Sequence, residues 1–204
     1  MLIDSSHHTS RPLGWLLPVA VVCIALLLTL PVMAGPREQA ARMHDRLAGV
    51  PASDSVLDDM ASHIAAGDDF SAAMIAMDNP AFYNVTLKHW VTPWTNEAFD
   101  VYAPLNDYTA TVIGLIRDDA DFRDVLSADV LYVGDAALNL PAYSTTNNQH
   151  YEAMEENVVD LQAHLQQTTQ SAETGIPADA TAGVLTTRAA AKAFFKDGTN
   201  RAMF

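Results

Sequence analysis

Cysteine is nearly absent from this chain of 204 residues: the single one, Cys23, lies in an apolar run close to the N-terminus. A disulfide needs two thiols, and so does covalent haem attachment through a C-x-x-C-H motif. Thiolate metal sites also use several cysteines. We therefore expect no disulfide, no thiolate metal site and no haem on the chain as given.

Basic side chains are also scarce. The chain has 11 Lys and Arg residues against 25 Asp and Glu, and its net charge is −14 with neutral histidines. Nucleic-acid binding requires clustered cations that neutralise phosphates, so this charge excludes nucleic acid as a partner. It also disfavours attraction to an anionic membrane surface. The part that follows residue 34 is an acidic domain, large enough for one hydrophobic core.

The motifs that define common enzyme classes are missing as well: the chain has no G-x-S-x-G, H-E-x-x-H, phosphate-loop or dinucleotide glycine pattern. We predict no catalytic residue. The pairs Asp58-Asp59, Asp68-Asp69 and Asp118-Asp119 do not share a helical face and lack the glycine and spacing of a calcium loop. The histidines are scattered, and His150 and His164 would be roughly 21 Å apart along one helix. We therefore predict no metal site.

The N-terminus carries an uncharged apolar run from Trp15 to Ala34, preceded by Arg11 and ending in Val32-Met33-Ala34. This order is typical of a secretory signal peptide, and the run is also long enough for a membrane anchor. Residues 1–34 are therefore predicted to be one or the other, with membrane contact through residues 15–34 if the segment is not cleaved. Three arginines that follow the run favour a cytoplasmic domain. The small-residue ending and the prolines favour export, so we expect an extracytoplasmic protein, periplasmic or anchored facing the periplasm.

After residue 34, apolar residues recur at helical spacing in short stretches separated by Pro, Gly and Asn. The pattern predicts helices over about residues 36–47, 53–66, 70–78, 83–92, 106–116, 121–126 and 187–196. Expected N-terminal caps are Ser55 with Asp58, Asn106 with Asp107, and Thr186 or Thr187. Residues 130–133 fit a buried strand or part of a helix, and residues 92–105 an ordered loop. The fold class is therefore all-α or nearly so, an irregular multi-helix domain over residues 35–204.

The clearest helical pattern runs from about Asn148 to Thr168. An apolar stripe recurs every three or four residues and is predicted to face the core; its members are Tyr151, Met154, Val158, Leu161 and Leu165. The opposite, solvated face would carry Glu152, Glu155, Glu156, Asp160, Gln162 and Gln166. We accordingly expect Leu161→Ala to lower the unfolding midpoint and Glu155→Ala to leave it unchanged. In the earlier stretch 70–78, one helical face is marked by Phe70, Ala73, Met74 and Met77.

Aromatic side chains are concentrated between residues 82 and 108, among prolines and amides. Such rings can line a ligand pocket or pack beside a cofactor; core packing beneath a proline-rich loop is the alternative. If the cluster binds a ligand, the predicted binding residues are Trp90, Trp94, Tyr102, Asn106 and Asp107.

Four short segments together resemble the helical domains of planctomycete-type cytochrome c-like proteins, a family of multi-domain exported proteins. They are Asp118-Asp119, the stretch from Phe122 to Asp129, Leu131-Tyr132-Val133, and Gly183 to Thr187. The resemblance extends over residues 105–204. It implies an extracytoplasmic protein whose later part carries haem through a C-x-x-C-H motif, which this chain lacks.

The stretch that ends at Phe204 looks like the start of another element. We therefore expect the sequence to be truncated, with any haem on a missing C-terminal segment. The leading hypothesis is an accessory or scaffold domain of an exported cytochrome c-like system, without catalysis of its own and with a protein partner in an electron-transfer assembly. One alternative is a ligand-binding module or enzyme that uses the aromatic loop 83–108, and another is a structural envelope protein.

Overall fold

The computed structural model describes residues 34–96 and 104–195. The chain divides into two units between Gly35 and Pro36, and the following account concerns the second unit. The predicted signal or anchor lies outside the described residues except for Ala34, and Tyr102 lies outside them too. Within the described ranges, no helix is long and apolar enough to cross a membrane.

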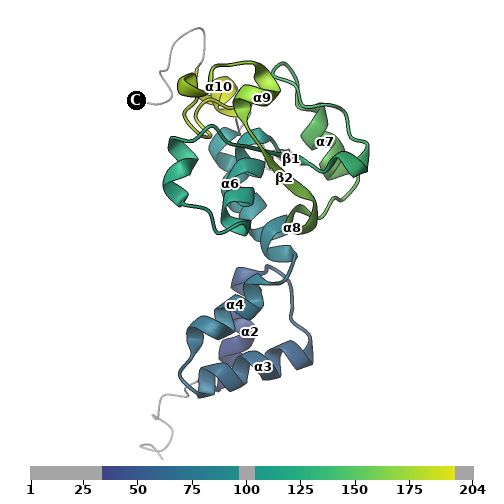
Figure 1. Ribbon diagram of the computed structural model, residues 1–204. Helices are drawn as coiled ribbons and strands as arrows, with labels where there is room; N and C mark the ends of the chain where they lie inside the picture. The colour runs from purple at the N-terminus through teal and green to yellow at the C-terminus, as the bar shows by residue number, and fades with distance from the viewer. Residues whose placement is uncertain (1–33, 97–103, 196–204) are drawn as a thin grey trace, which may run out of the picture. The chain divides into compact units, whose positions relative to one another are not determined.

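The first three helices, α2 (Pro36–Leu47), α3 (Asp54–Ala65) and α4 (Asp69–Met77), pack on one another (Figure 1). The structure confirms the predicted positions of all three. Ser53 caps α3, because its hydroxyl accepts the Val56 N–H, so the predicted capping box at Ser55 and Asp58 is wrong. The buried contacts among the three helices are made by Ala40, Met60, Ala72 and Ala76.

The buried face of α4 is not the one that its larger side chains mark in the sequence. Ala72 and Ala76 are fully buried, whereas Phe70 is 75% exposed and Met74 48% exposed. Small side chains allow the neighbouring helices to approach closely, and this packing fixes the rotation of α4 about its axis. Phe70 and Met74 are left facing outward, while Ile75 and Met77 are half-buried against the cores.

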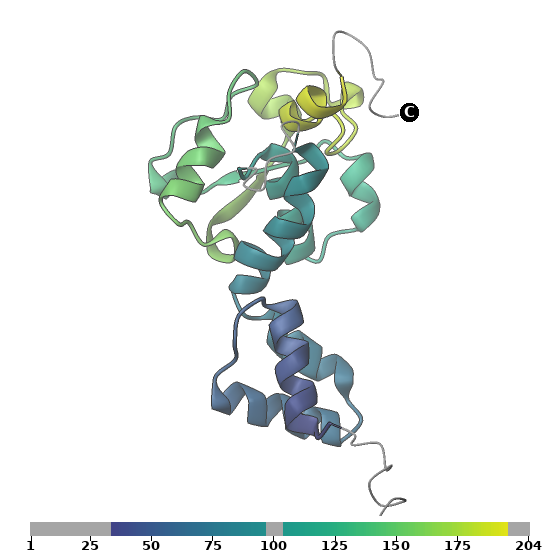
Figure 2. The same ribbon diagram turned by 180° about the vertical axis from the view of Figure 1, so that it is seen from behind.

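A second core surrounds α6 (Asp107–Arg117), in which every residue from Asp107 to Leu115 is buried. Strand β1 (Leu131–Gly134) lies against this helix and pairs antiparallel with β2 (Leu165–Thr168) (Figures 1 and 2). The helix approaches the sheet closely at Gly114, where a Cβ atom would lie 2.1 Å from Cδ1 of Tyr132. The ring of Tyr132 therefore occupies the space that a side chain at position 114 would need.

Short elements complete the domain. Before α6 come a π-helical turn η2 (Phe82–Leu87), α5 (Lys88–Val91) and a 3-10 turn η3 (Thr92–Thr95). After it come η4 (Phe122–Leu126), η5 (Ala136–Leu138), α7 (Gln149–Glu156), α8 (Leu161–His164), α9 (Gln170–Thr174), η6 (Ala178–Ala180) and α10 (Arg188–Phe194). Asn106 caps α6 and Thr187 caps α10, as predicted. The described residues are mostly helical, and 131–134 form the strand that the sequence allowed.

The predicted helix from residue 148 to 168 is wrong. Helix α7 ends at Glu156, and Val158 takes a left-handed backbone conformation with φ +52°. The Val158 N–H donates to the Glu155 carbonyl and the Val159 N–H to the Met154 carbonyl. These two bonds form a Schellman motif, which normally ends a helix at a glycine.

After this turn the chain forms α8 and then β2. Met154, Leu161 and Leu165 are all buried, but they belong to three different elements, and Val158 is 87% exposed. The apolar residues thus recur at helical spacing without lying on one helix. The sequence pattern identifies correctly most of the residues that reach the core and assigns them to the wrong backbone.

Candidate functional site

Two of the predicted binding residues, Trp90 on α5 and Trp94 on η3, are exposed by 62% and 51%. Their rings meet edge to face with centroids 6.1 Å apart. Trp94 contacts Tyr108 in the same way at 6.4 Å, and Tyr108 contacts Phe194 of α10 at 6.5 Å. The rings form a row from the surface into the core, so the aromatic cluster is partly core packing and partly exposed surface.

Asn106, another predicted binding residue, is buried. Its side-chain oxygen accepts the Thr109 N–H at 3.0 Å, and its amide nitrogen donates to Thr95 Oγ1 at 2.9 Å. The first bond caps α6 and the second ties the helix to η3. The side chain therefore holds the start of the central helix; its use in ligand binding stays a prediction.

Asp107, the last of the predicted binding residues, is completely buried. Its carboxylate accepts the N–H groups of Tyr108 and Ala189 at 3.0 Å and that of Arg188 at 2.7 Å. The Tyr143 hydroxyl donates to it at 3.1 Å. Hydrogen bonding of this kind compensates a buried charge, and the residue joins α6 to the start of α10. A ligand could bind the Asp107 carboxylate only by replacing some of these hydrogen bonds.

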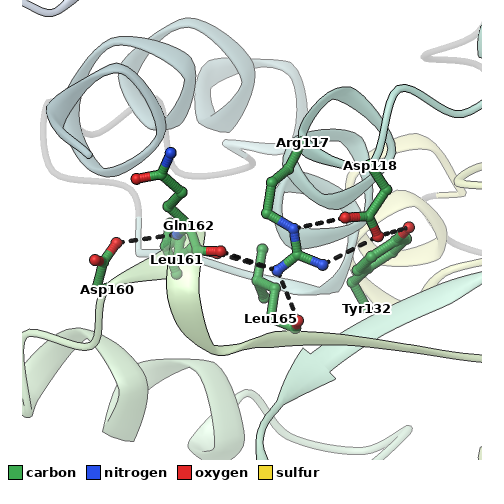
Figure 3. Close-up of polar contacts among 7 residues, drawn as sticks. All are labelled: Arg117, Asp118, Tyr132, Asp160, Leu161, Gln162 and Leu165. Carbon is green, nitrogen blue, oxygen red and sulfur yellow. Dashed lines mark hydrogen bonds and ion pairs between the residues drawn. The ribbon is translucent and has the colours of Figure 1, made fainter. Parts of the chain in front are cut away.

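At the other end of α6, Arg117 connects three parts of the domain (Figure 3). Its Nε and Nη2 donate to the two carboxylate oxygens of Asp118 at 2.7 and 3.0 Å. Its Nη1 donates to the main-chain carbonyl of Leu165 at 2.6 Å and also to those of Leu161 and Gln162, which lie in α8. The guanidinium thus satisfies carbonyl groups that the end of a short helix leaves without partners.

Asp118 also accepts a 2.7 Å hydrogen bond from the Tyr132 hydroxyl, which leads from the helix end to β1 (Figure 3). The Arg117 hydrogen bond is the main cause that holds the pKa of Asp118 below its ordinary value. Burial raises the pKa of the Tyr132 hydroxyl, and its hydrogen bond to the carboxylate adds to that shift. Both groups therefore keep their ordinary charge states at neutral pH, and the cluster is suited to holding structure together.

Beside Arg117 lies a hollow of about 550 Å³ between α4 and the C-terminal end of α6. Its apolar lining includes Phe70, Met74, Met77, Tyr83, Ile116 and Phe122. Phe70 and Met74 are the outward residues of α4, and Phe122 is 55% exposed. Asp78 and Asp119 also line it, and we call this set the acidic hollow.

The two carboxylates of the acidic hollow are exposed, and in the described part of the chain neither has a hydrogen-bond or ion-pair partner. The third charged residue of the lining, Arg117, is paired with Asp118. The unmatched charge around the hollow is therefore negative. Sequence reasoning missed this site because its apolar side chains come from separate elements that only the folded chain brings together.

The histidines that the structure describes have separate surroundings. His44 contacts the Val50 carbonyl through Nδ1 at 2.9 Å, and His63 contacts Asp68 at 3.3 Å. His150 is buried; its Nδ1 contacts the Pro141 carbonyl and its Nε2 accepts the Gly134 N–H. Over residues 34–96 and 104–195, no group of three or more His, Cys, Asp or Glu residues could hold a metal ion.

Glu155 differs from the solvated residue that the sequence predicts. Its carboxylate forms an ion pair with Lys88 and accepts the Leu105 N–H at 3.0 Å. Because these bonds connect α7 to α5 and to the residue before the α6 cap, Glu155→Ala is no longer expected to be neutral. A small cavity of about 110 Å³ lies beside this pair, between Asn84 and Leu161.

Comparison of the chain with protein-family models, with curated proteins and with solved structures found no match.

Proposed function

We propose that residues 36–204 are a protein-binding accessory domain of an exported cytochrome c-like system, without catalysis of their own. The observation that carries the proposal is the acidic hollow, where Phe70, Met74 and Phe122 expose large apolar surfaces around one depression. Contiguous exposed apolar surface is costly in water and is typical of a binding site. A partner that covered the hollow would remove this apolar surface from water, which favours binding there.

The buried polar groups of the domain support a role in structure. Asp107 accepts a hydrogen bond from the start of α10, and Arg117 donates to main-chain carbonyls in and just after α8. His150 contacts the main chain at the end of β1 and in the loop that leads to α7. Gln170 donates to the Val130 and Gly183 carbonyls at 3.1 and 2.6 Å. These side chains replace the regular hydrogen bonding that such short elements cannot supply.

The link to cytochrome c-like proteins depends on short segments, two of which contact each other. The Gly183 N–H donates to the Ala128 carbonyl at 3.0 Å, and the Val184 N–H donates to the Val125 carbonyl at 2.8 Å. A Cβ atom on Gly183 would lie 2.1 Å from the Val125 oxygen, and its φ of +53° also favours glycine. These two segments therefore belong to one local structure.

Site-specific photocrosslinking in the source cell tests this proposal. A benzophenone amino acid at position 122 should give one dominant cross-linked partner that mass spectrometry identifies as an extracytoplasmic protein. Position 195 is the matched control, because Phe195 is also an exposed phenylalanine, 46% exposed, but lies at the end of α10. No product at position 122, or the same product at both positions, would contradict the proposal.

A second candidate function is small-ligand binding at Trp90 and Trp94, favoured by the exposure of both rings. A ligand that stacks on them would change their fluorescence and lose affinity in a Trp90→Ala variant. Fluorescence titration with a panel of aromatic and sugar ligands checks this. A panel that leaves the emission unchanged would count against this candidate and leave the protein-binding proposal intact.

A further inference from the structure

The charges around the acidic hollow indicate the chemistry of its partner. Asp119 stands at the end of α6 and Asp78 at the end of α4, so two separate helices place an unpaired carboxylate beside the same apolar surface. Arg117 adds no free positive charge, because Asp118 is held against its Nε and Nη2 atoms. A partner that covered the hollow without cations would leave both carboxylates partly desolvated and unpaired, which is unfavourable.

We propose that the acidic hollow receives a cationic segment of a partner protein: large apolar side chains fill the depression, and Lys or Arg pairs with Asp78 and Asp119. This inference rests on the proposed function and names the partner's chemistry. The volume of about 550 Å³ is large enough for more than one apolar side chain. Apolar anchors supply most of the affinity in such contacts, while charges near the rim supply specificity and speed of association.

Two acidic residues near the hollow already have partners within the domain, so they are less available to a partner's cations. Asp68 accepts the Ser71 N–H at the start of α4 and contacts His63. Asp121 is paired with Arg123. Asp68 and Asp121 are thus already engaged, whereas Asp78 and Asp119, which line the hollow, have no side-chain partner in the part of the chain that the structure describes.

Fluorescence anisotropy with the full-length chain in uncharged detergent tests the inference. The probe is a short labelled peptide that carries Leu and Phe on one helical face and Lys on the other. Companion peptides replace every Lys by Glu, or every Leu and Phe by Ser. We expect the cationic apolar peptide to bind, the two companions to bind more weakly, and the affinity to fall as NaCl rises from about 0.05 to 0.3 M.

The decisive comparison is between two charge-matched double variants. Asp78→Asn with Asp119→Asn should weaken binding about five- to tenfold, the effect of losing two solvent-exposed ion pairs. Asn tolerates the left-handed conformation of Asp119, so the fold is preserved. Asp45→Asn with Asp179→Asn removes the same charge from exposed positions on α2 and η6 and should change the affinity less than about twofold.

Three results with the peptides would overturn the inference. They are no binding of the cationic peptide, equal binding of its Glu companion, and an equal loss of affinity in the control variant, which would indicate general attraction to an acidic protein. If photocrosslinking at position 122 still captures a partner in the Asp78/Asp119 double variant with unchanged yield, the inference fails and the proposed function stands. Phe122→Ser, at an exposed position, should weaken the peptide about tenfold or more. If it leaves peptide binding unchanged, the apolar surface of the hollow takes no part in binding and the proposed function fails as well.

Discussion

Val158→Gly is expected to stabilise the protein, because the native residue occupies a backbone conformation that suits glycine. A β-branched residue in the left-handed region is an outlier, and such strain costs about 1–3 kcal/mol. The φ of Val158 is +52°, and its side chain is 87% exposed, so little apolar burial is lost on its removal. The lost burial is roughly 0.3 kcal/mol, a small share of the value for a fully buried valine.

Glycine also adds freedom to the unfolded chain, which offsets about 0.5–1 kcal/mol of this gain. The net effect is then a stabilisation of about 0.5–1.5 kcal/mol, or a rise in Tm of a few degrees for a domain of this size. Urea unfolding followed by circular dichroism, together with a thermal scan, measures both quantities. Gly67→Val is the matched reverse change, because Gly67 ends α3 in the same motif with φ +79° and nothing near its Cβ position; it should destabilise.

The sign of the effect distinguishes two backbones. If residues 148–168 formed the continuous helix that the sequence pattern predicts, Val158 would be buried within it. Glycine there would lose helix propensity and buried surface and lower stability by about 2 kcal/mol or more. A destabilised Val158→Gly protein would therefore refute the Schellman turn and restore the long helix.

Three other predictions concern α6 and its two ends. Gly114→Ala should lower the free energy of unfolding by about 1–3 kcal/mol despite alanine's better helix propensity, because the new methyl group would overlap the buried Tyr132 ring. Urea unfolding measures this change, and a more stable variant would refute the close approach of α6 to β1. Asp107→Asn should cost about 2–4 kcal/mol in the same assay, because an amide N–H₂ would face N–H and O–H donors, and an unchanged midpoint would show that this carboxylate is dispensable. Arg117 lowers the pKa of Asp118, so this carboxylate stabilises the fold above its unfolded pKa of about 4, and the stabilisation is lost as the pH falls through the lower folded pKa. Asp118→Asn should therefore make the free energy of unfolding fall less steeply on acidification. An unchanged acid dependence would exclude this contribution.

Where a helix begins was predictable because the signal is local. Asn106 and Thr187 cap α6 and α10 through their own side chains, one turn from the N–H groups that they accept. The end of α7 was not predictable, because the residue that turns the chain there is Val158, and valine has no intrinsic preference for the left-handed conformation. The weak local sign was Asp160, which caps the short helix α8 by accepting the Gln162 N–H.

The candidate site was harder to predict than the helices, since its members are far apart in the chain. Helical spacing shows that Phe70 and Met74 share a face of α4, but the face that is buried depends on how closely the neighbouring helices approach. That approach is set by Ala72 and Ala76, and it is a property of three helices together. Sequence alone could therefore indicate an apolar face and could not indicate that it would line a hollow with Asp119.

Asp119 illustrates how the fold and the proposed binding site compete for one residue. Helix α6 ends in the same Schellman motif as α3, with Asp119 at φ +49° in the position that Gly67 occupies in α3. Stability alone would favour glycine there, and the negative end of the helix dipole also disfavours a carboxylate at this terminus. Two independent physical preferences thus oppose Asp119, and no hydrogen bond or ion pair in the described part of the chain compensates its side chain. A cation from outside the domain would supply that compensation, so the helix dipole at this terminus supports the same partner chemistry as the charges around the acidic hollow.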